Sequence, residues 1–290
     1  MNTKRLIALL GTLICLAAPL VATAATITFD PPGAATEGDW DDPDNWDLGR
    51  IPADGDHVVI PSGLTCTVNI SNAVCDSFDV DGTLKIANAA VLTIDHDSTL
   101  DGGGLRLLGA TSKLRIYFPD GPGGVIISGS GKIDCDDGRI EITGEPAGLI
   151  SRVEITGTVD IYGEGGQFVN EGTVVVDTGL ISVDTFLGYT DSPGDRWIVK
   201  GAGGALIFGH SILQQEDIRP TANYQLIDNV SSSSVIRFES GVITKGRLEM
   251  EGGYLDIREN VVMGDDTAGR HMQATGGKIV VDAGKQFQHK

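Results

Sequence analysis

The sequence predicts an all-β protein whose chain coils into a parallel β-helix, a type of solenoid. From Val58 onward, short apolar or alternating runs such as residues 84–86 (LKI) and 114–116 (LRI) are separated by Gly, Asp, Asn and Ser. Side chains of a strand alternate with a period of two, so the two apolar residues of each triplet face the same side. Together with 40 glycines among 290 residues, this pattern favours many short strands joined by tight turns.

The spacing of the strands favours a coil. Leu84 and Leu105 are 21 residues apart, Leu105 and Ile126 are again 21 apart, and Leu92 and Leu114 are 22 apart. A return near 21 residues with two or three short strands per turn fits one coil of a parallel β-helix. Short strands at even spacing also occur in a β-sandwich, whose hairpins bury one face of each sheet, and this remains the alternative architecture.

Residues 1–24 are predicted to be a signal peptide. A basic start at Lys4 and Arg5 is followed by an uncharged, mostly apolar run, and small residues at 22 and 24 suit cleavage after Ala24. The run is shorter than the about 20 apolar residues that a membrane-spanning helix needs. We therefore expect an exported protein without a membrane span, secreted or at the cell surface, with the periplasm as a further location.

The exported chain is strongly acidic. The formal net charge is −19 at pH 7, and removal of the signal peptide, which has two basic residues and no acids, makes it −21. Such a chain repels nucleic acids and other polyanions unless cations intervene, so no nucleic-acid partner is expected. The partners expected instead are an extracellular polysaccharide or a protein surface.

Residues 25–57 are expected to form an N-terminal capping segment, and residues 58–290 to carry the β-helix repeats. Two of the three tryptophans, Trp40 and Trp46, lie ahead of the first regular strand. Large apolar rings at this point could plug the end of the apolar column.

The same segment carries a resemblance. Its residues follow the pattern W…NW…GxxP…GDxVxI between Trp40 and Ile60. This pattern is similar to the opening of secreted bacterial right-handed parallel β-helix proteins of the adhesin or surface type, and the similarity extends to Ile86. The resemblance implies a right-handed parallel β-helix at a cell-surface or extracellular place. It implies no single activity, because such scaffolds serve adhesins, surface-layer components and polysaccharide-degrading enzymes alike.

Three cysteines remain after export. Cys66 and Cys75 are close in sequence, and an oxidising compartment favours a local disulfide between them. The alternative is a pair of buried thiols. Cys135 is expected to be a small buried hydrophobic residue.

The acidic loop with Asp39, Asp41 and Asp44 is a candidate calcium site. Calcium prefers several oxygen ligands, and alternating acids on a loop can converge on one ion. The loop lacks the glycine and the terminal glutamate of a helix–loop–helix calcium site, so the alternative is a solvated loop whose carboxylates form turns and caps. Apart from calcium, no cofactor is expected. Two further acidic clusters surround residues 76–81 and 134–137.

The C-terminal end predicts one more strand, at residues 276–282. A strand at the end of a stack has unpaired backbone groups on its outer edge. We expect this edge to be covered by Phe287 and the last residues, by a partner in an oligomer, or by a continuation of the array.

No catalytic residue is assigned. Arg106, Arg115 and Arg139 alternate with apolar residues, which places them on outward faces of strands, although a polysaccharide lyase could use such an arginine as its base. A glycoside hydrolase would need paired carboxylates, and the abundance of Asp makes chance pairs easy. The sequence therefore predicts a structural or adhesive binding module. The alternative is a calcium-dependent polysaccharide lyase or hydrolase on the same scaffold.

Overall fold

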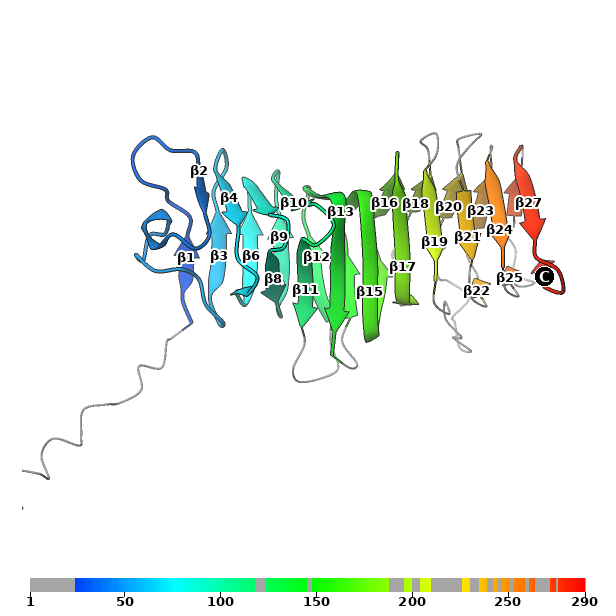
Figure 1. Ribbon diagram of the computed structural model, residues 1–290, viewed down its shortest axis with the longest axis horizontal. Coiled ribbons are helices and arrows are strands. Elements are labelled where there is room, and N and C mark those ends of the chain that lie inside the picture. Colours follow the sequence, from blue (N-terminus) through cyan, green and yellow to red (C-terminus); the bar gives the residue numbers. More distant parts are fainter. Residues whose placement is uncertain are drawn as a thin grey trace, which may run out of the picture.

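The fold is a parallel β-helix, as the sequence predicted, and Figure 1 shows its strands stacked along one long axis. The computed structural model describes residues 24–117, 124–144, 148–187, 196–199, 204–209, 226–229, 235–238, 242–244, 247–250, 253–258, 261–263, 272–274 and 276–289. Residues 1–23 of the predicted signal peptide lie outside these ranges. Within the described part, no helix is long and apolar enough to cross a membrane.

Each coil contributes strands to three faces. Face 1 contains β1 (Thr26–Thr28), β3 (His57–Ile60), β6 (Ser77–Val80), β9 (Ser98–Leu100), β12 (Gly124–Ser128) and β14 (Gly148–Ser151). Face 2 contains β2 (Glu37–Asp39), β4 (Thr65–Val68), β7 (Thr83–Ile86), β10 (Gly104–Leu108), β16 (Thr173–Val176), β18 (Arg196–Val199), β20 (Leu226–Asn229), β23 (Arg247–Met250) and β26 (Met272–Ala274). Face 3 contains β5 (Ala73–Val74), β8 (Val91–Ile94), β11 (Lys113–Tyr117), β17 (Leu180–Leu187), β19 (Ala205–Phe208), β21 (Val235–Phe238), β24 (Tyr254–Ile257) and β27 (Lys278–Val281).

Two long strands bend around the corners and join the faces. β13 (Lys132–Thr143) pairs with β10 on face 2 and with β11 on face 3. β15 (Glu154–Asn170) continues over all three faces. A separate sheet of β22 (Val242–Thr244), β25 (Val261–Met263) and β28 (Phe287–His289) takes the place of face 1 in the later coils. All pairings between these strands are parallel, which excludes the hairpins of a β-sandwich.

The core is a column of inward side chains that repeat from coil to coil. Cys66, Leu84, Leu105, Ile133 and Ile155 are register partners on face 2, and all five are fully buried. Outward neighbours in the same strands are polar or charged. The period-two alternation therefore determines which side of each strand faces the column.

The predicted return near 21 residues holds for some coils only. Leu84 pairs with Leu105, and Leu92 pairs with Leu114, as expected. Leu105, however, pairs with Ile133, 28 residues later, and Ile126 lies on face 1 beside Ile150. The second spacing of 21 was therefore wrong as an indicator of the coil, because the lengths of the corners vary while the strand register does not.

The corner between faces 1 and 2 requires glycine. A Cβ atom on Gly103 would lie 2.1 Å from the carbonyl oxygen of Gly82, and one on Gly131 would lie 2.3 Å from that of Gly103. Successive coils thus approach each other at this corner more closely than any residue with a side chain permits.

The N-terminal end holds a cluster of aromatic rings, where the sequence predicted large apolar side chains. Trp46 packs edge-on against Phe29 and Trp40, with ring centroids 5.3 and 5.1 Å away. The indole N–H of Trp46 donates to the carbonyl oxygen of Trp40 at 2.9 Å, and the three side chains are buried. Strand pairing already begins inside the predicted capping segment 25–57, because β1 and β2 pair with β3 and β4.

The loop before β3 is closed by a buried carboxylate. Asp56 accepts hydrogen bonds from Arg50 and from the backbone N–H groups of Ala53 and Ala25. The hydrogen bonds from Arg50 lower the pKa of Asp56 below its ordinary value, although burial acts in the opposite direction. This acid therefore stays ionised and connects the start of β1 to the loop.

The cysteines form no disulfide in the structure, which differs from the predicted Cys66–Cys75 bond. Cys66 lies in β4 on face 2, Cys75 follows β5 on face 3, and both are free, buried thiols. Nearness in sequence does not bring two Cβ atoms together when the chain turns a corner between them. Burial raises the pKa of both thiols. Cys135 is also a buried thiol within the core, as predicted.

Candidate functional site

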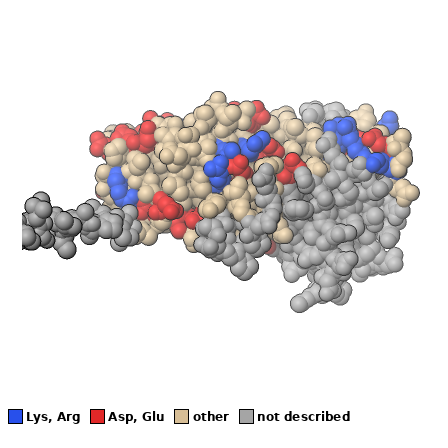
Figure 2. Space-filling view, turned by 60° about the horizontal axis from the view of Figure 1, so that its bottom comes forward, with Lys and Arg blue, Asp and Glu red and all other residues tan. Residues whose placement is uncertain are grey.

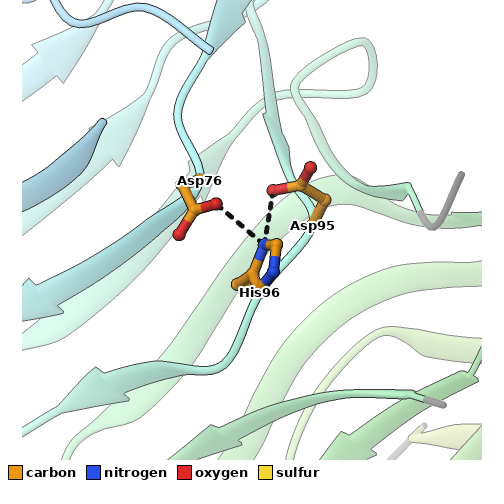
Figure 3. Close-up of side chains that lie close together, drawn as sticks. All are labelled: Asp76, Asp95 and His96. Atoms are coloured by element: carbon orange, nitrogen blue, oxygen red, sulfur yellow. Dashed lines mark hydrogen bonds and ion pairs between the residues drawn. The ribbon is translucent and has the colours of Figure 1, made fainter. Parts of the chain in front are cut away.

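Three polar side chains meet at the corner between faces 3 and 1. Asp76 lies between β5 and β6, and Asp95 and His96 lie at the same corner of the next coil, between β8 and β9. The backbone N–H groups of Asp95 and His96 donate to the carbonyl oxygen of Asp76 at 3.2 and 2.9 Å, which stacks one corner on the other. Figure 3 shows both carboxylates directed at the same imidazole nitrogen.

The distances within this cluster are short. The Nδ1 atom of His96 is 3.1 Å from Oδ1 of Asp95 and 2.8 Å from Oδ1 of Asp76. The hydrogen bond to Asp95 and the charges of Asp76 and Asp95 raise the pKa of His96, although its burial opposes this. The imidazole is 65% exposed, so solvent weakens these interactions. The arrangement favours a protonated histidine that bridges the two aspartates.

The same atoms are also a potential cation-binding set. One ligand atom from each of Asp76, Asp95 and His96 lies within 4.8 Å of the others, and this is the group of that kind in the described residues. A set with an imidazole nitrogen suits a transition metal or zinc better than calcium, which prefers oxygen ligands. A cation and the shared proton would compete for the same position.

A ladder of hydrogen bonds extends from this cluster along face 1. Ser77 Oγ donates to Asp76 at 3.2 Å and lies 2.9 Å from Nδ1 of His57. The Nε2 atom of His57 is 3.1 Å from Asp79, which also accepts a hydrogen bond from Thr99. A serine, a histidine and an aspartate are thus in contact.

This contact is arranged for stability and not for nucleophilic catalysis. The hydroxyl proton of Ser77 is directed at Asp76, so the serine accepts from His57 and does not give its proton to it. Ser77 is also only 6% exposed. A serine nucleophile needs an accessible oxygen and a base that takes its proton, and neither condition is met.

A shallow groove of about 450 Å³ follows the corner between faces 1 and 2 over successive coils. Its floor is the glycine backbone at Gly82 and residues 102–104, and hydroxyl groups come from Ser62, Thr65 and Thr83. Charged side chains surround it: Asp81, Arg106, Lys132 and Asp134. Its volume is within the range of small-ligand sites. The glycines that let the coils approach each other thus also leave the corner open.

Face 3 presents a second group of charges. Lys113 and Arg115 bind Glu141 at 3.0 and 2.6 Å, and Arg139 binds Asp160 at 2.8 Å and lies over the ring of Tyr162. Burial raises the pKa of Glu141, but the hydrogen bonds from Arg115 and Lys113 outweigh it, and the net pKa is lowered. Figure 2 shows basic side chains next to acidic ones along the surface, and not a continuous basic patch.

The predicted calcium ligands are not brought together. Asp41 accepts a hydrogen bond from Asn69 at 2.7 Å, and the 3₁₀ helix Pro43–Asn45 begins with Asp42 capping the N–H of Asp44. Among the described residues, Asp39, Asp41 and Asp44 do not form a group with ligand atoms within 4.8 Å. The alternative of turn- and cap-forming carboxylates describes this loop better, because its oxygens are used by local hydrogen bonds.

The structure also separates the arginines from the acids that precede them in sequence. Arg139 pairs with Asp160 of the next coil on face 3, whereas Asp134 lies on face 2 within 3.4 Å of Arg106. The Asp76–Asp95–His96 cluster was missed because its members come from two coils. The signal for it was the recurrence of acids after strands of the same face, one coil apart.

Comparison with curated proteins and with solved structures gives no match. The match that is found covers the coils that carry both the His96 cluster and the groove. Residues 45–167 match the family model of the G8 domain, and over this stretch the chain is similar to that family.

Proposed function

We propose that this chain is an exported β-helix module, secreted or held at the cell surface, that binds an extracellular polysaccharide in the groove between faces 1 and 2. The leader-like residues 1–24 support export, and the parallel β-helix with its G8-like region fits an extracellular or structural module in general. The observation that carries the proposal is the groove itself, which lies on a rigid stack of coils.

The chemistry of the groove suits a sugar chain. Hydroxyl groups of Ser62, Thr65 and Thr83 and the open glycine backbone offer donors and acceptors to sugar hydroxyls. Arg106 and Lys132 can bind carboxylate groups, and Asp81 and Asp134 can accept from hydroxyls. An elongated corner repeated over several coils fits an extended ligand better than a compact one.

The ion pairs favour binding over lyase chemistry. Arg106, Arg115 and Arg139 have a carboxylate partner in the next coil at 3.4, 2.6 and 2.8 Å. A carboxylate partner stabilises the protonated arginine, whereas a lyase base must be able to take up a proton. The role we propose is therefore adhesive or structural.

Isothermal titration with a panel of uronate-containing and neutral polysaccharides tests this proposal. We expect binding that the double substitution Arg106→Ala/Lys132→Ala weakens by about tenfold or more, which corresponds to about 1.4 kcal/mol. Lys85→Ala, on face 2 but not among the groove residues, is the matched control. No binding to any member of the panel contradicts the proposal.

An assay for unsaturated or reducing ends, with calcium added, addresses the enzyme alternative. We expect no turnover above the buffer control. Turnover that is abolished by Arg139→Ala or Asp136→Asn would replace the binding role by a polysaccharide lyase or hydrolase.

A further inference from the structure

The outer edge of β27 differs from the strand that precedes it on face 3. Leu255 and Ile257 of β24 are fully buried, whereas their register partners Ile279 and Val281 are 38% and 40% exposed. In the part of the chain that the structure describes, no strand pairs with this edge. The side chain of Phe287, one of the expected covers of this end, lies outside the described residues. A section of the apolar column is therefore open to solvent.

The hydrogen bonds of β27 define which backbone groups face outward along the stack. The N–H groups of Lys278 and Asp282 donate to the carbonyl oxygens of Gly253 and Ile257, both at 2.9 Å. Alternate residues of a paired strand bond to opposite neighbours. The N–H and C=O groups of Ile279 and Val281 thus face the open edge and are available to another strand.

The sequence of this edge is complementary to itself. Residues 278–282 are Lys-Ile-Val-Val-Asp. A twofold axis through Val280, perpendicular to face 3, places a second copy of β27 antiparallel to the first. Ile279 then lies opposite Val281 of the second copy, which is the pair with edge-facing backbone groups. Lys278 lies opposite Asp282 of the second copy, in a pair whose side chains approach closely.

The same axis joins the two apolar interiors. Because the axis is perpendicular to the face, inward side chains stay inward, and Ile279 and Val281 of both copies continue one column. The N-terminal end offers no equivalent surface, since Ile27 of β1 is fully buried and the rings of Phe29, Trp40 and Trp46 pack there. A tail-to-tail contact is therefore favoured over a head-to-tail one.

We propose that two copies of this chain associate end to end through β27, with Lys278 of each copy paired to Asp282 of the other. The contact is isologous and closes at a dimer. It gives a rod of twice the length with the two capped ends outermost. The groove is remote from this edge in sequence and in the stack, so the association does not depend on polysaccharide binding.

Sedimentation equilibrium of the purified protein over a concentration series, with small-angle scattering, tests the association. We expect a dimer whose maximum dimension is about double that of the monomer, because the copies join by their ends. Lys278→Glu and Asp282→Lys each place like charges opposite each other at two symmetric positions, and each should weaken association by about tenfold. The combined Lys278→Glu/Asp282→Lys variant should restore it to within about threefold, because the pairs are exchanged.

Lys85→Glu is the control, since it makes the same charge change on face 2, far from the edge. Circular dichroism checks the fold of each variant, and both edge residues are exposed. The proposal is overturned by a protein that stays monomeric up to about 200 µM, a range that would detect even weak association. It is also overturned by growth beyond dimers, by a side-by-side dimer in scattering, or by equal sensitivity to Lys85→Glu and Lys278→Glu.

Discussion

Asp56 illustrates how much a single side chain can organise. Its carboxylate receives the guanidinium of Arg50 and two backbone N–H groups from different segments. The sequence placed Asp56 in a Gly-Asp-x-Val-x-Ile run, which the resemblance marked as the entry to the first coil. It did not show which groups the acid would contact, because Arg50, Ala53 and Ala25 come together only when the loop closes.

Asp56→Asn should lower the free energy of unfolding by about 2 kcal/mol at pH 7, because an amide cannot replace a charged acceptor of several hydrogen bonds. The pKa of Asp56 is lowered in the folded protein, so its contribution is present above the ordinary pKa of an aspartate. It is lost as the pH falls through the lowered value. Urea unfolding between pH 7 and pH 3 measures both effects.

Asp54→Asn is the matched control for this experiment, since Asp54 is an exposed acid in the same loop. Its stability should stay close to that of the unsubstituted protein. Equal losses in the two variants would show that the Asp56 contacts have no special role.

At the scale of the element, strands were easier to predict than corners. Alternation defined the inward side of runs such as residues 84–86 and 114–116, and burial agrees with it. The coil from Leu105 was misjudged because the number of residues in a corner is not encoded by the alternation. The Asp76–Asp95–His96 cluster escaped prediction for the same reason, since finding it requires the register between two coils.

Gly103→Ala should destabilise the protein by about 2 kcal/mol or more, because its Cβ would lie 2.1 Å from a backbone oxygen that has no room to move. The adjacent Gly104→Ala is the control. Its Cβ would be 3.4 Å from the nearest atom, the carbonyl oxygen of Lys132. Thermal unfolding of the two variants compares them, and a Gly103 variant as stable as the Gly104 variant would contradict the close-packed corner.

At the scale of the whole molecule, the two ends of the stack are unlike. Aromatic rings pack at the N-terminal end, whereas apolar side chains of β27 are exposed at the other (Figure 1). The sequence predicted the first feature from its tryptophans and left the second among several alternatives. Which alternative applies depends on a surface contact that composition does not report.

Trp46→Ala should increase hydrogen exchange in β1–β4 and leave β19 and β21 unchanged, because coils of a solenoid interact mainly with their neighbours. The loss of a large buried ring costs about 3–5 kcal/mol locally. Hydrogen exchange followed by mass spectrometry gives the comparison, and Trp46→Phe is the milder control that keeps a ring. A uniform rise in exchange along the chain would contradict this local behaviour.

Corner length has a further consequence. Cys66 and Leu84 are 18 residues apart and Leu105 and Ile133 are 28 apart, yet both pairs are adjacent rungs of the same ladder. Insertions at a corner therefore change the outline of the rod at one height and leave its pitch untouched. The reach of this protein depends on how many times the backbone goes round, and segments grafted at different corners would be held at fixed intervals, like pegs on a measuring staff.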